Sequence, residues 1–222
     1  MGNKGSKTGA TYDNSKANEK RPPARGLKGA YDQLVHAFIR PPRATYTVNM
    51  LGPTTFRVAG MSFKRRDISL SNPRKQKLEC SFWEPQPPEG QKAVPRPCVV
   101  YLHGNSSCRA GALEMLPNLL MAGFSVFALD FSGCGHSEGE YISLGYYECQ
   151  DVATVIKYLR ECGRVSTIGL WGHSMGAATS VMFAHTDPSV AAMVLDCAFA
   201  DLRQLVRGGL CCLRFSICVA CR

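Results

Sequence analysis

The 222-residue sequence has no apolar stretch long enough to cross a membrane. Its longest apolar run, Leu119–Leu129, falls well short of the roughly 20 residues that a membrane-spanning helix needs, and it ends at Asp130. The first thirty residues are polar and basic, so they lack the apolar centre of a secretory signal peptide. Both absences favour an intracellular protein without a membrane-spanning helix.

Sequence patterns for nucleotides, metals and nucleic acids are also missing. Neither a P-loop nor a dinucleotide-binding glycine fingerprint occurs, and the cysteines do not show the paired spacing of a zinc site. The 11 cysteines are scattered, some in or beside apolar runs, as at Cys98 and Cys197. We therefore predict that the cysteine thiols are reduced. We also predict that the protein needs no cofactor and no metal for its reaction and that it has no nucleic-acid partner.

Acidic residues are scarce relative to basic ones, with 17 Asp and Glu against 26 Lys and Arg and a formal net charge of +9. Residues 1–28 hold seven basic and two acidic side chains, an excess of five positive charges. Residues 1–45 are rich in Gly, Lys, Asn, Ser and Pro, which predicts a flexible basic segment with one short helix over Tyr31–Ile39. Such a segment suits an anionic membrane surface, and a solvated tail is the alternative.

The N-terminal residues Met1-Gly2-Asn3-Lys4-Gly5-Ser6 match the myristoylation pattern, in which Gly2 becomes the acceptor after Met1 is removed. One myristoyl chain binds membranes only weakly, so stable attachment needs a second signal such as a basic segment. We therefore predict a cytoplasmic protein that attaches peripherally to an anionic membrane surface through its N-terminus. An incidental glycine is the alternative interpretation.

Apolar strands and amphipathic helices alternate from Cys98 onward. Buried strands are predicted over Val99–Leu102, Phe124–Leu129, Thr167–Trp171 and Ala191–Leu195, and two earlier strands over Phe63–Leu70 and Lys77–Trp83. Strands that alternate with helices predict the α/β class, with a mostly parallel sheet and helices on both faces.

A nucleophile elbow is the strongest catalytic signal. Gly172-His173-Ser174-Met175-Gly176 fits the pattern G-x-S-x-G and lies between a predicted strand and a predicted helix. The strained turn lifts the serine hydroxyl off the backbone, and small residues at Gly172 and Gly176 avoid collisions around it. The helix that follows directs N–H groups at a developing oxyanion. We predict that Ser174 is the nucleophile; a glycine-rich turn with an incidental serine is the alternative.

Two loops after the first parallel strands accompany the elbow. In the first, the backbone N–H groups of Asn105 and Met175 are the expected oxyanion donors. We expect His103 to brace this loop by hydrogen bonding rather than to act in catalysis. The second loop begins at Asp130 and is rich in glycine, and we expect it to be structural, with Asp130 fixing its conformation.

These motifs occur in the order found in the α/β-hydrolase superfamily, which the chain resembles over roughly Phe63–Leu202. More narrowly it resembles the serine aminopeptidase S33-like group, which includes monoacylglycerol lipases. The segments that resemble a poorly characterised set of plant and protist α/β-hydrolases are Ile142–Glu148, Ile168–Gly172 and Met193–Asp196. The resemblance implies the α/β-hydrolase fold, Ser174 as nucleophile and Asn105 with Met175 as oxyanion hole.

The chain departs from this family after Leu202. The family places its acid after the next strand beyond Leu195 and its histidine after the strand that follows, whereas the last histidine here is His185. Asp196 and Asp201 are the candidate acids, and a structural role at the strand end is the alternative for Asp196. We predict a basic segment over 1–45, an incomplete α/β-hydrolase domain over 46–202 whose last strands are missing, and a divergent cysteine-rich tail over 203–222. The last predicted strand would then form an unpaired edge.

The resemblance implies a serine hydrolase that cleaves an acyl ester, thioester or amide through an acyl-serine intermediate. The expected partners are an acyl-containing small molecule or a lipidated protein. A serine without a general base loses several orders of magnitude in rate. The alternative is therefore a catalytically inactive, truncated α/β-hydrolase that acts as a binding or membrane-associated scaffold protein.

Overall fold

A computed structural model describes residues 11–13, 26–40, 42–87, 89–199 and 217–220 of the chain. Gly2 and Asp201 lie outside these residues, as does the predicted tail except for 217–220. The strands are β1 (Thr11–Asp13), β2 (Arg43–Thr45), β3 (Thr55–Val58), β4 (Met61–Ser71), β5 (Lys77–Pro85), β6 (Arg96–Leu102), β7 (Ser125–Leu129), β8 (Val165–His173), β9 (Val190–Asp196) and β10 (Ile217–Ala220). The helices are α2 (Gly26–Ile39), α3 (Leu116–Met121), α4 (Tyr146–Glu161) and α5 (Met175–Thr186), with 3₁₀ turns η1 (Val48–Leu51) and η2 (Arg109–Glu114).

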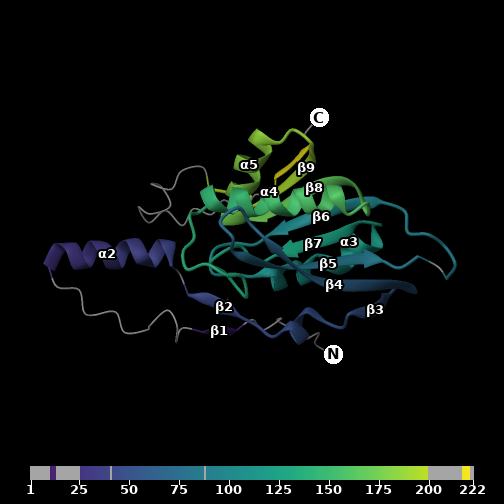
Figure 1. Ribbon diagram of the computed structural model, residues 1–222, viewed down its shortest axis with the longest axis horizontal. Helices are drawn as coiled ribbons and strands as arrows, with labels where there is room; N and C mark the ends of the chain where they lie inside the picture. The colour runs from purple at the N-terminus through teal and green to yellow at the C-terminus, as the bar shows by residue number, and fades with distance from the viewer. Residues whose placement is uncertain (1–10, 14–25, 41, 88, 200–216, 221–222) are drawn as a thin grey trace, which may run out of the picture.

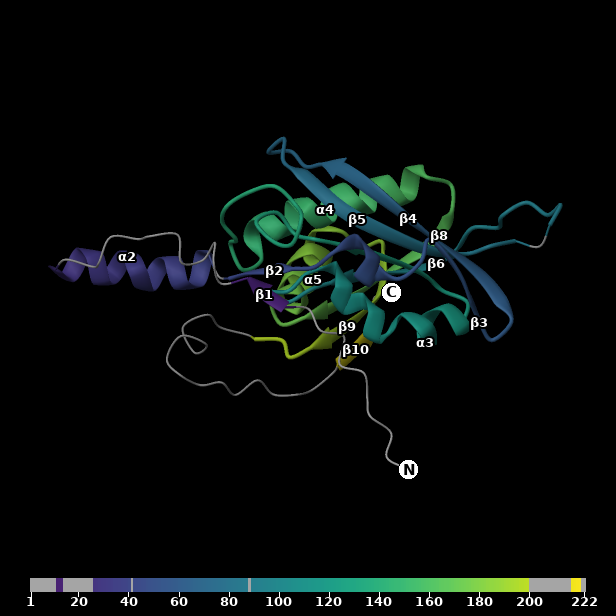
Figure 2. The ribbon, with the colours of Figure 1, turned by 90° about the horizontal axis from the view of Figure 1, so that it is seen from below.

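An eight-stranded sheet forms the body, in the order β10-β9-β8-β6-β7-β5-β4-β3 (Figure 1). The four central strands β7, β6, β8 and β9 run parallel, and antiparallel strands flank them on both sides. Helices α3 and α4 lie on opposite sides of the sheet (Figure 2). The predicted α/β-hydrolase fold is therefore confirmed, with the crossover helices on both faces that parallel strands require.

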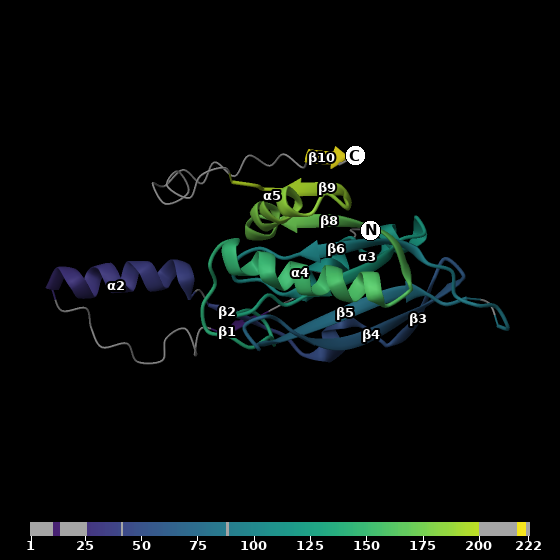
Figure 3. The ribbon, with the colours of Figure 1, turned by 45° about the horizontal axis from the view of Figure 1, so that its top comes forward.

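The edge of the sheet differs from expectation. β10 pairs antiparallel with β9, with Ile217 opposite Leu195 and Ala220 opposite Ala192, and Figure 3 shows the two strands side by side. The prediction that the last parallel strand is an unpaired edge is therefore wrong. The short apolar stretch Ile217–Ala220 provides the backbone donors and acceptors that such an edge leaves unmatched.

The apolar residues Leu113, Leu116 and Leu120 share the spacing of one helix face, but the structure divides this stretch into two elements. A 3₁₀ turn, η2, ends at Glu114, and α3 begins at Leu116 with Pro117 in its first turn. Proline has no backbone N–H, so it is tolerated in the first turn of a helix but not in its interior. This residue therefore favours a new helix start over one continuous helix.

The core lies in two layers, one on each face of the sheet. Alternate residues of β6 enter opposite layers: Val100 and Leu102 pack with α4 and α5, whereas Tyr101 packs with η2 and α3. From α4, Val152 and Val155 are fully buried against the first layer. Each such aliphatic side chain stabilises the fold by about 1.5–3 kcal/mol, and together they hold the strand ends that carry the site.

Arg43 of β2 connects the N-terminal part of the chain to the loop after β7. The guanidinium of Arg43 donates hydrogen bonds to the carbonyl oxygens of Gly133, Ser137 and Gly139, at 3.0, 3.2 and 2.6 Å. The expected helix over Tyr31–Ile39 is present as α2, which begins at Gly26 and projects away from the sheet (Figure 1). Within the described residues, no helix combines the length and apolarity needed to span a membrane.

Candidate active site

Ser174 lies on the strand–turn–helix element that its motif predicts. It separates β8 from α5, and its φ of 51° places it in the left-handed region that residues other than glycine rarely adopt. Its N–H donates to the carbonyl oxygen of Asp196 at 2.8 Å. The half-buried Ser174 makes no side-chain N-cap hydrogen bond to α5. No N-cap hydrogen bond engages the hydroxyl, which leaves it available for chemistry, and the surrounding structure must maintain the strained backbone.

Close packing explains the glycines around the serine. A Cβ on Gly172 would overlap the carbonyl of Gly176, and a Cβ on Gly176 would overlap the carbonyl of Leu102 at the end of β6. A Cβ on Gly104 would lie 2.9 Å from Cδ2 of His173 and 3.5 Å from Cβ of Ser174. The loop after β6 is therefore pressed against the elbow, as an oxyanion hole built from both elements requires.

The two expected oxyanion donors occupy suitable elements. Met175 is the first residue of α5 and is fully buried. N–H groups in the first turn of a helix have no acceptor within the helix, so they are available to an anion. Asn105 lies exposed in the turn after β6, directly after the glycine that touches the elbow. The structure brings Asn105 and Met175 to the same strand ends, and their role as donors stays a prediction.

His103 braces the loop after β6, as expected. Its buried ring accepts a hydrogen bond from the N–H of Phe131 at Nε2, at 3.0 Å, so Nδ1 carries the proton and donates to the carbonyl oxygen of Gly104 at 2.8 Å. Burial lowers the pKa of His103 and outweighs the opposing effect of the Asp130 carboxylate. The ring stays neutral and joins the two loops after β6 and β7.

Asp130 organises the glycine-rich loop, which confirms its expected structural role. Its buried carboxylate accepts hydrogen bonds from the N–H groups of Arg109 and His136 and from the hydroxyl of Tyr46, at 2.7, 2.9 and 2.6 Å. Burial and this carboxylate raise the pKa of Tyr46, so the phenol keeps its proton. Gly135 passes so close that a Cβ would strike the carboxylate.

A second buried carboxylate, Asp151 of α4, was missed by the sequence reasoning. It accepts hydrogen bonds from the N–H and hydroxyl of Ser132, at 2.9 and 2.6 Å, and from the side-chain amide of Asn72 at 2.8 Å. Burial is the largest influence on its pKa and raises it. The available signal was an acidic residue directly before Val152 on the buried face of a predicted helix. Asp151 therefore anchors the glycine-rich loop after β7 to α4.

Asp196, a candidate acid, has a histidine partner. Nδ1 of His173 lies 2.8 Å from Oδ2 of Asp196, and the side chains are 43% and 35% exposed. Sequence reasoning did not predict this pair, because it depends on the register of two strands. Among the described residues no imidazole hydrogen-bonds to the Ser174 hydroxyl. Asp201, the other candidate acid, lies outside the described residues.

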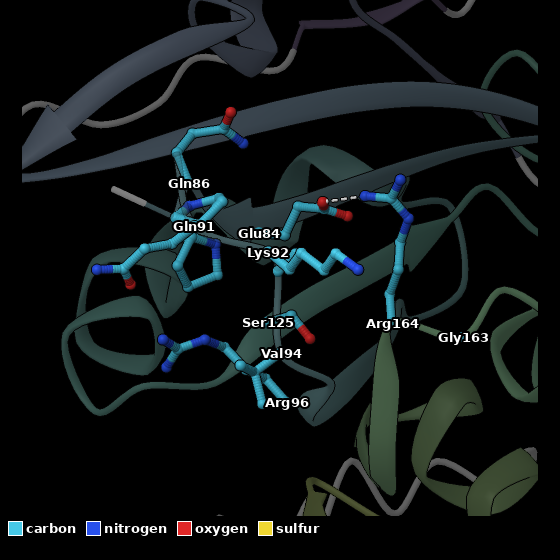
Figure 4. Close-up of a pocket in the computed structure, with 12 residues that line it drawn as sticks. Glu84, Gln86, Gln91, Lys92, Val94, Arg96, Ser125, Gly163 and Arg164 are labelled. Atoms are coloured by element: carbon cyan, nitrogen blue, oxygen red, sulfur yellow. Dashed lines mark hydrogen bonds and ion pairs between the residues drawn. The ribbon is translucent and has the colours of Figure 1, made fainter. Parts of the chain in front are cut away.

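A cavity of about 120 Å³ lies at the opposite end of the sheet, where β6, β7 and β8 begin (Figure 4). Arg164 forms an ion pair there with Glu84, with 2.5 Å between Nη1 and Oε1. Arg96 and Ser125 also line it. Ser174 follows the carboxyl end of β8, so this cavity does not belong to the serine.

A family model described as the alpha/beta hydrolase fold matches residues 97–210. An uncharacterised 31.7 kDa protein of Escherichia coli is 34% identical over 125 residues, which cover 54% of this chain and 43% of that protein. The lysophosphatidylserine lipase ABHD12 of Gallus gallus is 27% identical over 117 residues, covering 50% of this chain and 30% of the lipase. The chain thus spans less than half the length of these curated relatives.

Solved esterase structures share the fold. The esterase Pf2001 of Pyrococcus furiosus superposes with a TM-score of 0.58 at 24% identity, covering 72% of this chain and 57% of the esterase. Acetyl xylan esterase 1 of a Thermoanaerobacterium species gives a TM-score of 0.54 at 20% identity, covering 68% of this chain and 53% of that enzyme. The narrower similarity to S33-like, plant and protist proteins stays a prediction.

Proposed function

Because the chain belongs to the α/β-hydrolase fold family, we propose that it is a serine hydrolase that cleaves an acyl ester, thioester or amide. The Ser174 oxygen attacks the acyl carbon, and the N–H groups of Asn105 and Met175 stabilise the oxyanion that forms. The bond between the acyl carbon and the leaving group breaks, and the leaving group departs with the proton that the Ser174 hydroxyl gives up, which leaves an acyl-serine. Water then attacks the acyl carbon, releasing the acid and restoring the hydroxyl.

The observation that supports this proposal most directly is the conformation of Ser174. A left-handed serine costs about 1–3 kcal/mol, and such strain persists only where the surroundings enforce it. Here the close contacts of Gly104, Gly172 and Gly176 enforce it, and the hydroxyl makes no N-cap hydrogen bond. A turn that only connected a strand to a helix would need neither the strain nor these three contacts.

For the substrate class we favour an acyl ester. Relatives and structural neighbours include a lysophosphatidylserine lipase and esterases, and such names support an acyl ester more than an amide. A lipidated protein carrying a thioester-linked acyl chain presents the same kind of carbonyl carbon. Both kinds of substrate place the acyl group where the elbow and the loop after β6 meet.

Ester hydrolysis by the purified chain tests the proposal. The substrates are p-nitrophenyl esters of increasing acyl length and lysophosphatidylserine, and Ser174→Ala is compared with Ser69→Ala, which replaces an exposed serine of β4. We expect Ser174→Ala to lose more than about a thousandfold in rate, while Ser69→Ala keeps the original rate. Equal rates for the original chain and Ser174→Ala would contradict a serine mechanism.

A binding or scaffold protein is the second candidate function. It is favoured by the lack, within the described residues, of an imidazole hydrogen-bonded to the Ser174 hydroxyl, because serine without a general base is a poor nucleophile. This function predicts no turnover of any ester by the folded chain. It also predicts that acyl compounds bind equally to the original chain and to Ser174→Ala, which equilibrium dialysis measures.

We also propose that the protein attaches to anionic membranes through its N-terminus. Gly2 lies outside the described residues, and α2 follows it as a helix that projects from the body with Leu27 and Tyr31 exposed. Labelling with a myristate analogue is expected in the original chain and not in Gly2→Ala. Vesicles containing phosphatidylserine should sediment the myristoylated chain more efficiently than Gly2→Ala. Equal labelling of both chains would end this part of the proposal.

A further inference from the structure

Three side chains with different donor atoms converge beyond the ends of β8 and β9. One ligand atom from each of His173, Asp196 and Cys197 lies within 4.8 Å of the other two. All three side chains are half-buried, so solvent and small ions can reach them. In the part of the chain that the structure describes, this is the only such group of three.

The backbone explains why the three groups meet. His173 and Asp196 are register partners on parallel strands, so their side chains leave the sheet on the same face. Cys197 would point to the opposite face if β9 continued regularly. Its φ of 53° breaks that alternation, and its sulfur lies beside the other two groups. The hydrogen bond from the N–H of Ser174 to the carbonyl oxygen of Asp196 fixes the position of this corner.

The donor set selects a particular class of ion. Imidazole, carboxylate and thiolate together suit Zn²⁺ and related transition metals, whereas Mg²⁺ and Ca²⁺ require oxygen ligands. We propose that His173, Asp196 and Cys197 bind a divalent transition-metal ion of the zinc class, with water in the fourth position. The ion displaces the thiol proton of Cys197 as it binds, and that proton leaves to solvent.

The distances are close to those that binding requires. In a tetrahedral zinc site neighbouring ligand atoms are roughly 3.3–3.8 Å apart, from metal–ligand distances of about 2.0–2.3 Å. The present 2.8 Å between His173 and Asp196 must lengthen by about half an ångström as the ion replaces their hydrogen bond. No separation between the three ligand atoms exceeds 4.8 Å, so none must shorten by more than about one ångström, which rotation of half-buried side chains accommodates.

The site adjoins the elbow, so occupancy has a consequence for Ser174. An ion bound there holds the His173 ring, whose Cδ2 lies against Gly104 in the loop after β6. We expect Zn²⁺ to slow ester hydrolysis. This consequence rests on the proposed function, whereas metal binding does not. Binding is therefore measured in full-length Ser174→Ala chains, in which failure of the nucleophile has no influence.

Cobalt(II) provides the spectroscopic probe, because a cobalt–thiolate bond gives a charge-transfer absorption that nitrogen and oxygen ligands do not. The parent chain for this experiment is full-length Ser174→Ala in which the tail cysteines are also replaced by serine: Cys211, Cys212, Cys218 and Cys221. We expect the band to saturate at one cobalt ion per chain and to disappear when Zn²⁺ is added. Adding Cys197→Ser to this parent should abolish the band.

Matched variants decide between a built site and incidental thiol binding. His173→Gln and Asp196→Asn should each weaken cobalt binding at least about tenfold, since even indirect partners of a metal contribute that much. Cys162→Ser replaces another half-buried cysteine, at the end of α4, and should leave the band unchanged. Circular dichroism checks folding, and if Cys197→Ser does not fold, the His173 and Asp196 variants decide. The proposal is overturned by a parent without the band, by a band that survives Cys197→Ser, or by unchanged affinity in both other variants.

Discussion

At the residue scale, the loops around Ser174 are held by buried polar side chains with specific partners. The Asp130 carboxyl group is completely buried, and three hydrogen-bond donors together with the nearby Arg109 guanidinium offset its loss of hydration. The buried ring of His103 is neutral, and hydrogen bonds satisfy both of its nitrogens, because one accepts a hydrogen bond and the other donates one. Each side chain joins segments that are distant in sequence, so replacing it affects several segments at once.

Asp130→Ala should lower the free energy of unfolding by about 3–5 kcal/mol, because it leaves the buried Arg109 guanidinium without its carboxylate. Glu140→Ala is the matched control, since Glu140 pairs with Arg40 on an exposed surface and should cost at most about 1 kcal/mol. Urea denaturation followed by circular dichroism measures both changes. Equal effects of the two substitutions would contradict the role given to Asp130.

His103 predicts a dependence of stability on pH. Its folded pKa is lowered by burial below the ordinary value of 6.5, so below pH 6.5 the unfolded chain binds a proton that the folded chain refuses. Its contribution to stability is therefore complete above pH 6.5 and decreases as the pH falls, by at most about 1.4 kcal/mol per pH unit. Urea denaturation between pH 7.5 and 5 should show a shallower slope for His103→Gln than for the original chain. His185→Gln, at an exposed position of α5, should keep the original slope.

At the element scale, the elbow depends on close backbone contacts that leave no room for a side chain larger than hydrogen at Gly172 and Gly176. Gly176→Ala places a methyl group against the carbonyl of Leu102, so β6 and α5 must separate. We expect a loss of about 3 kcal/mol or more, together with loss of ester hydrolysis. Gly169→Ala is the control, because Gly169 lies on β8, the strand that leads to the elbow. The added carbon would lie 3.3 Å from the Ala192 carbonyl oxygen, so this substitution should change the free energy of unfolding by at most about 1 kcal/mol. Thermal unfolding measures the stability of both variants. An unchanged stability of Gly176→Ala would contradict the close packing of Gly176 against the Leu102 carbonyl.

Local patterns in the sequence were sufficient for the central elements. The apolar runs and the G-x-S-x-G motif predicted β6 to β9, α5 and the turn at Ser174, because each signal lies within a few neighbouring residues. The pairing of β10 with β9 and the contact of His173 with Asp196 depend on register between distant segments. Composition and spacing carry no information on register, so neither feature could be predicted.

At the scale of the whole molecule, Arg43 connects the N-terminal part to the loop after β7. One planar guanidinium reaches three carbonyl oxygens of that loop, which a lysine cannot reproduce with a single ammonium group. We expect Arg43→Ala to lower the free energy of unfolding by roughly 2–3 kcal/mol and Arg43→Lys to recover only part of it. Arg40→Ala, which removes an exposed ion pair, is the control, with an expected loss below about 1 kcal/mol. Full recovery in Arg43→Lys would show that charge alone matters at this position.

The central claim is that Ser174 is an activated nucleophile held by a strained elbow. Incubating the folded full-length chain with a fluorophosphonate probe and mapping the adduct by mass spectrometry tests this claim most directly. We predict a single adduct on Ser174, none in Ser174→Ala, and an unchanged adduct in Ser69→Ala. No adduct on the folded chain, or the same labelling in Ser174→Ala, would contradict the account and favour a binding protein that keeps the fold without the chemistry.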